Sequence, residues 1–309
     1  MGIFAIGICK LIFTIPEERK RITPNTMTFQ DLYPHPSLAE YVRLYHLRHF
    51  EFKNFHDLPF KPYPPRPEQC LIFIPREQQT VEYAKQGKLV KRPRSVIVGQ
   101  QTSRINLGIA QDFLTIIVVF QPGKLSRLTG IPSQELTHSE CDAEAVFSTD
   151  IVRVNERLNS TDSYPEMIGI IEQFLSEIIF KRKRYVHPID AVGNLIFNKP
   201  ENVSVDWLAG QACLSPRQFE RKFAEAMGVG PKMFARISRF YKTYNMKFRN
   251  PSLDWLSIAV ACGYHDYQHL VKDYKDFAGS LPTVFFKEDE NAPERLFGVH
   301  EPGDHPDVV

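Results

Sequence analysis

The C-terminal part of this 309-residue chain carries one pattern twice, and the two copies begin 51 residues apart. In Phe223–Phe234 and in Tyr274–Phe285, Gly, Pro and Phe follow the first aromatic residue at identical offsets. A Gly that ends one helix and a Pro that begins the next explain this spacing. A repeat of fixed period indicates one supersecondary unit used twice.

The residues before the first copy predict a helix-turn-helix. Residues 205–213 place small and apolar side chains at helical spacing. Ser215 and Pro216 then form an N-cap and a first helical position. In the helix that follows, Phe219 and Phe223 share one face, and polar and basic residues occupy the other. A short helix, a tight turn and a second helix with a polar face are typical of this motif.

A second unit of the same kind precedes the second copy. Residues 256–262 form the short helix, Gly263 lies in the turn, and Asp266 is the predicted N-cap of the second helix. Leu270 and Tyr274 take the positions of the two phenylalanines in the first unit. The second turn is one residue longer than the first.

A basic helix is predicted between the two units. Residues 231–249 contain six Lys or Arg and no Asp or Glu. A helix of this length spans roughly 27 Å. That length suits two reading helices in major-groove segments about 34 Å apart on one face of DNA.

These motifs resemble the double helix-turn-helix domain of AraC/XylS-type transcription regulators over about residues 188–288. The residues that carry the resemblance are Leu208, Ala209, Ser215, Phe219, Arg221 and Phe223, then Ile258, Ala259, Gly263, Tyr264, Gln268, Leu270, Gly279 and Pro282. The resemblance implies that the exposed face of each second helix contacts DNA bases.

The candidate contacts fall into two sets. The base-contact candidates are Arg217, Gln218, Glu220, Arg221, Tyr267, Gln268 and Lys272. The phosphate-contact candidates are Ser215, Lys222, Lys232, Arg236, Arg239, Lys242 and His269. Arg221 suits a bidentate contact to guanine and Gln268 one to adenine. Because Asp266, Asp273 and Asp276 make the second reading helix acidic, we expect the second unit to read more weakly than the first.

Residues 27–144 predict a β-rich domain. Short runs at 70–74, 80–83, 95–98, 105–109 and 113–120 are rich in β-branched and aromatic residues and are separated by turn signals. Many short strands of this kind form a small sandwich or barrel. The family resemblance implies a cupin-like domain that senses a small-molecule effector. The expected fold class is therefore α+β and multidomain, with an all-α C-terminal domain.

The sequence also supports predictions for the remaining segments. Residues 145–187 predict a helical hairpin with an apolar stripe, which the resemblance implies is used for dimerisation. For residues 1–26 we expect a poorly ordered extension, or a start of translation at Met27 instead of Met1. Residues 289–309, rich in Pro, Gly and acidic side chains, are expected to be a disordered tail.

Composition and motifs argue against other classes. The net charge is only +2, and the five cysteines show no CxxC spacing, which favours a reducing cytoplasm over a disulfide or zinc scaffold. A metal-dependent enzyme is the alternative, with His46 and His49 as its nearest ligands, together with His35 and His56. No His-x-His, nucleophile elbow, phosphate loop or dinucleotide fingerprint is present. We therefore expect no catalytic residue, metal site or cofactor.

The sequence as a whole predicts a transcription regulator that binds specific double-stranded DNA. The expected partners are DNA, a small effector, a second copy of the chain and RNA polymerase, without a membrane. The alternative is an effector-independent DNA-binding protein whose N-terminal domain only mediates assembly.

Overall fold

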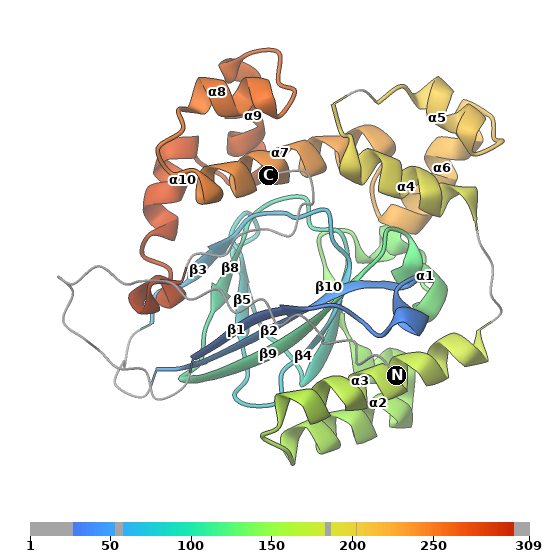
Figure 1. The fold of residues 1–309 in the computed structure, drawn as a ribbon, viewed down its shortest axis with the longest axis vertical. Coiled ribbons are helices and arrows are strands. Elements are labelled where there is room, and N and C mark those ends of the chain that lie inside the picture. The colour runs from blue at the N-terminus through green and yellow to red at the C-terminus, as the bar shows by residue number, and fades with distance from the viewer. Residues whose placement is uncertain (1–26, 53–57, 183–186, 202, 300–309) are drawn as a thin grey trace, which may run out of the picture.

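The computed structural model of the chain describes residues 27–52, 58–182, 187–201 and 203–299. A β-rich N-terminal domain lies beneath a row of helices, and the two helix-turn-helix units stand at opposite ends of the long helix α7 (Figure 1). The predicted extension at residues 1–26 lies outside the described residues.

The N-terminal domain is an open sandwich of two antiparallel sheets. The larger sheet has the order β1 (Met27–Leu32), β2 (Val42–Glu51), β9 (Asp112–Phe120), β4 (Cys70–Phe73), β7 (Ser95–Val98) and β10 (Glu140–Asp142). The smaller sheet has the order β3 (Lys61–Tyr63), β8 (Ile105–Gly108), β5 (Thr80–Tyr83) and β6 (Lys88–Lys91). The two sheets are separate, so the sandwich alternative is confirmed over a closed barrel.

Alternation along the strands gives the larger sheet two different faces. On β9, Leu114, Ile116 and Val118 belong to the main core, and Phe113 and Thr115 point toward the space between the sheets. The predicted runs coincide with β4, β5, β7, β8 and β9. The sequence missed β1, β2, β3, β6 and β10; β2, the longest strand, carries histidines and arginines that conceal its burial.

A helical hairpin, α2 (Ala143–Asn159) and α3 (Tyr164–Lys181), covers the outer face of the larger sheet (Figure 1). The backbone of α2 breaks at Ser148, with φ 50° and ψ −134°. Ile171 and Leu175 are fully buried in the core shared with the sheet. The apolar stripe therefore packs on the chain's own sheet and is not exposed for a partner.

The helical region contains both predicted units. The first unit is α5 (Val205–Gln211) and α6 (Pro216–Met227), and the second is α8 (Trp255–Ala261) and α9 (Tyr267–Phe277). They are joined by α7 (Pro231–Arg249) and flanked by α4 (Pro188–Asn198) and α10 (Pro282–Asp289). Each unit has its own core, one around Phe219 and Phe223 and the other around Leu270 and Tyr274.

Capping residues set the helix boundaries as predicted. The Ser215 hydroxyl accepts a hydrogen bond from the Gln218 amide at 3.4 Å, and the Gln218 side chain completes a capping box. Asp266 caps α9 by accepting from the His269 amide at 2.9 Å. Gly228, with φ 83°, ends α6 in the left-handed conformation.

The expectation of a disordered C-terminal tail is wrong for the residues up to 299. A short 3-10 helix, η3 (Pro293–Phe297), follows α10, and Ala292, Glu294 and Arg295 are buried. Acidic composition suggested disorder, but an ion pair and contacts with other parts of the chain fix this segment. The rest of the tail, residues 300–309, lies outside the described residues.

Among the described residues, no helix combines the length and the apolar character that crossing a membrane requires.

Candidate nucleic-acid interface and interior cavity

The first reading helix, α6, exposes all four of its predicted base contacts. Arg217, Gln218, Glu220 and Arg221 are all exposed, because Phe219 and Phe223 turn the opposite face into the core of the unit. The Gln218 side chain oxygen accepts from Ser215, so these two candidates bind each other. Arg221 pairs with Glu225 at 2.6 Å on the surface. A pair this exposed is worth little and opens easily for a base contact.

The second reading helix, α9, exposes Gln268, His269 and Lys272, and Tyr267 is half-buried against the core of its unit. Asp266 serves as the helix cap and hydrogen bonds the His269 ring at 2.9 Å. The exposed face of α9 therefore carries an amide, an imidazole and an ammonium group, which are hydrogen-bond partners for bases and phosphates.

The acidic residues of α9 do not dilute this face. Asp273 is buried, and it accepts hydrogen bonds from Arg236 at 2.6 and 3.0 Å and from the Tyr264 hydroxyl at 2.9 Å. Asp276 also binds Arg236, at 2.6 Å. Asp273 and Asp276 therefore hold α9 against α7, and the weaker reading expected of the second unit stays a prediction.

Three of the predicted phosphate-contact residues also form ion pairs within the helical region. Arg236 and Arg239 both face Asp273, and the Arg239 guanidinium lies 4.3 Å from the centre of the Tyr264 ring. Lys242 pairs with Glu201 at 2.8 Å. Burial, and then the charge of Asp273, raise the pKa of Tyr264, so its hydroxyl remains a donor. These cations of α7 hold the helical domain together, and their partners could not be predicted from local sequence patterns.

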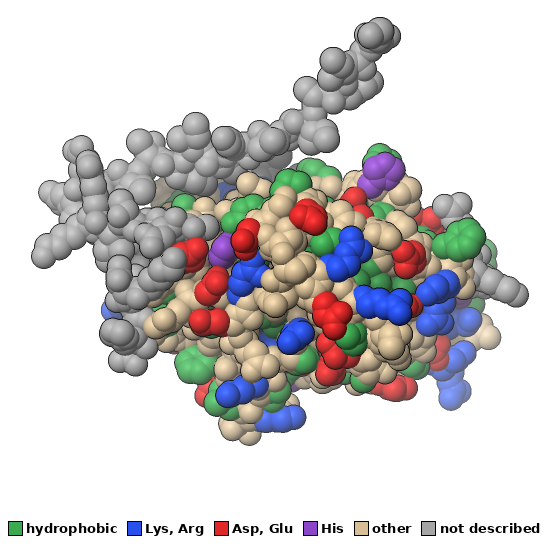
Figure 2. Space-filling view, turned by 90° about the horizontal axis from the view of Figure 1, so that it is seen from below, with side chains coloured by type: hydrophobic (Ala, Val, Ile, Leu, Met, Phe, Trp, Pro, Cys, Tyr) green, Lys and Arg blue, Asp and Glu red, His purple; other side chains and the backbone are tan. Residues whose placement is uncertain are grey.

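The other phosphate candidates are more accessible. Ser215 and Lys232 are exposed, and Lys222 is half-buried. By contrast, the face that carries the α2–α3 hairpin mixes acidic and basic side chains wherever described residues form it (Figure 2). That face offers no basic stripe to a phosphate backbone.

Both units are docked on the sandwich. In the first unit, Gly228 O accepts from Thr137 Oγ1 at 2.5 Å, and Asp190 of α4 receives a bidentate pair from Arg127 at 2.7 and 3.0 Å. In the second, the Arg104 amide donates to Phe277 O at 2.7 Å, and its guanidinium pairs with Glu288. The N-terminal domain can therefore influence how both reading helices are held.

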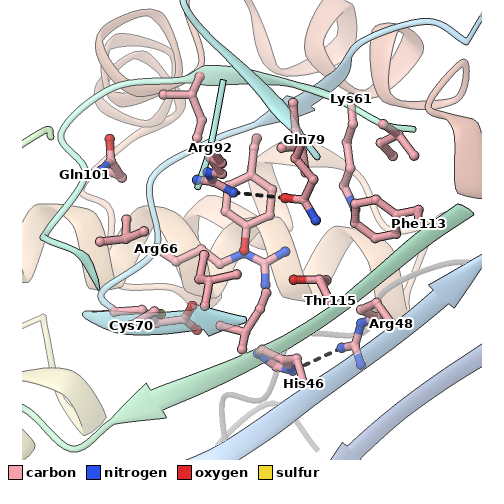
Figure 3. Close-up of a pocket in the computed structure, with 18 of the residues that line it drawn as sticks. His46, Arg48, Lys61, Arg66, Cys70, Gln79, Arg92, Gln101, Phe113 and Thr115 are labelled. Atoms are coloured by element: carbon pink, nitrogen blue, oxygen red, sulfur yellow. Dashed lines mark hydrogen bonds between the residues drawn. The ribbon is translucent and has the colours of Figure 1, made fainter. Parts of the chain in front are cut away.

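A cavity that is partly open to solvent lies between the two sheets (Figure 3). Its apolar wall includes Phe50, Phe113, Ile105 and Leu107. The polar and charged side chains that line it are His46, Arg48, Lys61, Arg66, Glu68, Gln79, Arg92, Gln101, Thr115 and Glu294. An apolar wall with a few polar groups is typical of a small-molecule site. The sequence missed it because its residues come from six strands, the loops between them and the C-terminal segment.

Internal ion pairs hold several of these polar groups. Arg92 pairs with Glu140 at 2.9 Å and also donates to Gln79, whose amide nitrogen is turned away from Arg92 (Figure 3). Asp31 binds both His46 and Arg48. Burial opposes ionisation of Asp31, but these two partners hold its pKa below its usual range.

The histidines proposed for the metal alternative do not converge. His46 and His49 lie on opposite faces of β2: His46 lines the cavity, while His49 binds Tyr164 and Asp112. His35 caps a short 3-10 helix at Pro36–Leu38, and His56 is outside the described residues. One group of metal-ligand types among the described residues, His265, Asp266 and His269, is held by capping contacts at the start of α9.

Comparisons with known proteins agree with this arrangement. Residues 208–288 match a helix-turn-helix domain family of AraC type, and residues 30–142 match a domain of unknown function, DUF6597. No curated protein matches the chain.

Three solved structures are similar in part. ToxT from Vibrio cholerae is 12% identical, with 78% of this chain and 97% of that chain covered and a TM-score of 0.45. An AraC-type regulator from Chromobacterium violaceum is 22% identical over 34% of this chain and 93% of that chain, with a TM-score of 0.30. The DNA-binding domain of AdpA, in complex with a target DNA, is 21% identical over 34% and 95%, with a TM-score of 0.31.

Two helix-turn-helix units on one connecting helix, each with an exposed polar reading face, define a DNA-binding protein of the double helix-turn-helix class. The chain carries an AraC-type helix-turn-helix DNA-binding domain at residues 208–288.

Proposed function

We propose that this regulator binds a specific DNA site through α6 and α9, and that a small molecule in the cavity of the N-terminal sandwich controls this binding. The observation that carries the proposal is the docking of both units on the domain that encloses the cavity. A ligand that changes the sandwich alters those contacts and hence the positions of the reading helices.

We assign the individual DNA contacts from the exposure of the candidate side chains. Arg217, Glu220 and Arg221 on α6 and Gln268 and Lys272 on α9 are the proposed base contacts. Gln218 and Tyr267 contribute less, because one is engaged in a capping box and the other packs against its core. Ser215, Lys222, Lys232 and His269 are the proposed phosphate contacts.

Selection of bound fragments from random DNA tests the DNA-binding proposal. We expect two enriched segments about one helical turn, or 10.5 base pairs, apart. Recovery of fragments without any shared segment would show that binding is not sequence-specific.

A separate measurement tests effector control. A molecule that binds only the native state raises the melting temperature as its concentration rises. If a compound raises the melting temperature but leaves DNA affinity unchanged, the N-terminal domain binds it without control, and the effector-independent alternative holds.

We further propose a homodimer that acts in the cytoplasm, contacts RNA polymerase when bound to DNA, and has no catalytic role. The four described cysteines are all free thiols, which suits a reducing compartment. Since the hairpin stripe is buried in its own domain, the dimer must use another surface. Sedimentation equilibrium with and without DNA measures the number of chains, and a single chain under both conditions would contradict the dimer.

A further inference from the structure

The segment that follows the last helix of the DNA-binding region enters the cavity of the sandwich. We call residues 290–299 the C-terminal strap; it leaves α10 and lies beside β3 (Figure 1). Glu294 of the strap lines the cavity together with residues of the two sheets. A segment attached to the second helix-turn-helix unit therefore supplies part of the wall of the candidate ligand site.

Glu294 places a carboxylate on the ammonium group of Lys61. The two charged atoms are 2.6 Å apart, and the side chains are only 2% and 8% exposed. Glu294 Oε1 lies at ion-pair distance from Lys61, but neither carboxylate oxygen of Glu294 has a hydrogen-bond partner among the described residues. A buried carboxylate without hydrogen bonds keeps much of its desolvation cost, so this pair is a weak way to hold the strap.

Lys61 differs from two other cations of the cavity in the origin of its acid. Arg48 pairs with Asp31 of β1, and Arg92 pairs with Glu140 of β10. Both acids belong to the sandwich, whereas Glu294 comes from beyond the DNA-binding units. Withdrawal of Glu294 would remove this carboxylate from a buried positive charge of the cavity.

The strap is also fastened to the second unit. Arg295 pairs with Asp289 at the end of α10, donates to Val299 O at 2.6 Å, and lies 4.8 Å from the centre of the Phe248 ring of α7. Val299 packs against the apolar cluster between the sheets. The strap thus links the cavity to α7 and α10.

The rest of the cavity suits an apolar molecule with one polar end. Aromatic and aliphatic side chains from both sheets form most of its wall. His46 Nε2, Gln79 Nε2 and Gln101 Oε1 are buried polar atoms on the wall, and none has a hydrogen-bond partner among the described residues. A carboxylate on Lys61 would have a cation beside it and polar groups nearby.

We propose that this cavity binds a small organic monoanion, a carboxylate with an apolar body, which takes the place of Glu294 on Lys61 and releases the C-terminal strap. The proposal rests on the effector control proposed above. It adds the class of the ligand and the contact, between Glu294 and Lys61, through which ligand binding would affect the DNA-binding units. Glu294 is the internal occupant of the position that the ligand's carboxylate takes.

Decanoate is a suitable probe, with 1-decanol as the neutral control of equal chain length, in calorimetric titrations of the full chain. If the strap-free state is at most about a tenth of the molecules, Glu294→Gln should tighten decanoate binding about tenfold or more, because the competing carboxylate is gone. The affinity for decanol should change less. Equal decanoate affinities of wild type and Glu294→Gln would overturn the proposal.

The double variant Lys61→Met/Glu294→Gln is the matched control, since it removes both charges of the Lys61–Glu294 pair. It should lose the preference for decanoate over decanol that Glu294→Gln shows. Retention of that preference would place the anion away from Lys61 and overturn the proposal.

Cleavage by trypsin after Arg295 reports on the strap itself, because Arg295 is buried when the strap is docked. Decanoate should accelerate this cleavage in the wild type, and Glu294→Gln should accelerate it without ligand. Cleavage after the exposed Lys88 on β6 should not change. Decanoate binding without faster cleavage at Arg295 would show that the strap stays in place, and the proposal would fail.

The outcomes separate this proposal from the proposed function. Decanoate binding that is insensitive to Glu294 and Lys61 leaves effector control intact and removes the strap mechanism. Absence of decanoate binding in every variant, with DNA binding intact, overturns the ligand class alone. Loss of sequence-specific DNA binding in the wild type contradicts the proposed function and does not depend on the strap.

Discussion

At the residue scale, the two turns of the helix-turn-helix units require the same backbone conformation at equivalent positions. Cys213 in the first turn has φ 54°, and Gly263 in the second has φ 74°. Both values lie in the left-handed region, which glycine adopts without penalty and other residues adopt at a cost. The left-handed position in the turn is therefore occupied by Cys in the first unit and by Gly in the second.

This equivalence predicts opposite effects of two substitutions. Gly263→Ala should lower the free energy of unfolding by about 1–3 kcal/mol, because the backbone is left-handed there and an added Cβ would lie 2.2 Å from Glu201 Cγ. Cys213→Gly should raise it by at most about 1 kcal/mol. Urea unfolding measures both, and a destabilised Cys213→Gly would mean that the thiol makes a contact worth more than the relief of φ.

Arg221 is the residue whose loss should change sequence preference most clearly. It is exposed on α6, and its partner Glu225 lies on the same helix, so the guanidinium can turn toward a base. Arg221→Ala should cost about 1–3 kcal/mol in affinity and relax the preference at one base pair. Titrations against the selected site and its single-base variants measure this. An equal loss on all sequences would identify Arg221 as a phosphate contact.

At the scale of elements, α7 and α9 are joined through one buried carboxylate. Asp273 binds Arg236, Arg239 and Tyr264. Asp273→Asn should lower the free energy of unfolding of the helical region by about 3–5 kcal/mol, because it removes the buried acid that faces the half-buried guanidinium groups of Arg236 and Arg239. Asp276→Asn is the control: Asp276 is half-buried and binds Arg236 at the surface, so its loss should cost about 1 kcal/mol or less. Similar losses in a denaturant titration would contradict the central role of Asp273.

The same contacts separate the cations of α7 in their effect on DNA binding. Lys232→Ala should reduce the slope of log affinity against log salt by about 0.9, as expected for one phosphate contact. Arg239→Ala should leave the slope unchanged, because its guanidinium faces Asp273 and Tyr264. Binding isotherms at several salt concentrations measure both slopes, and equal reductions would show that Arg239 also reaches the phosphates.

The helical units could be predicted from the sequence because their signals are local. Ser215, Pro216, Gly228 and Asp266 cap or end helices through neighbouring residues, and the apolar periodicity of α6 and α9 needs no distant partner. Strand β2 could not be predicted in the same way. Its His46 and Arg48 are buried through Asp31, 15 and 17 residues away, and a local pattern does not reveal that pairing.

The candidate sites show the same difference between local sequence signals and contacts between distant residues. The exposed face of α6 follows from helical spacing, so its reading residues could be predicted. The internal role of Arg236 and Arg239 depends on how α9 lies against α7, and the meeting of Lys61 with Glu294 depends on the path of the chain between two domains. Contacts between residues distant in sequence decided every correction.

At the scale of the whole molecule, two separate features fix the relative position of the two reading helices: the connecting helix and the contacts with the sandwich. The connecting helix α7 has 19 residues and spans roughly 27 Å. Each unit is also docked on the sandwich, through Asp190 and Gly228 on one side and Phe277 and Glu288 on the other. The protein should therefore recognise two DNA segments at one spacing only.

Changes in the selected DNA site test this rigidity. An insertion of five base pairs between the two segments turns the second one to the opposite face of the duplex, so the contacts of Gln268 and Lys272 should be lost. Affinity should fall at least about tenfold, given about 1–3 kcal/mol for a good base contact. An insertion of ten base pairs restores the facing but adds about 34 Å, which α7 cannot span, so affinity should stay low. Recovery of affinity with the ten-base-pair insertion would mean that the two units move independently. If the affinity depended on the first unit's segment alone, α6 would be the sole reading helix.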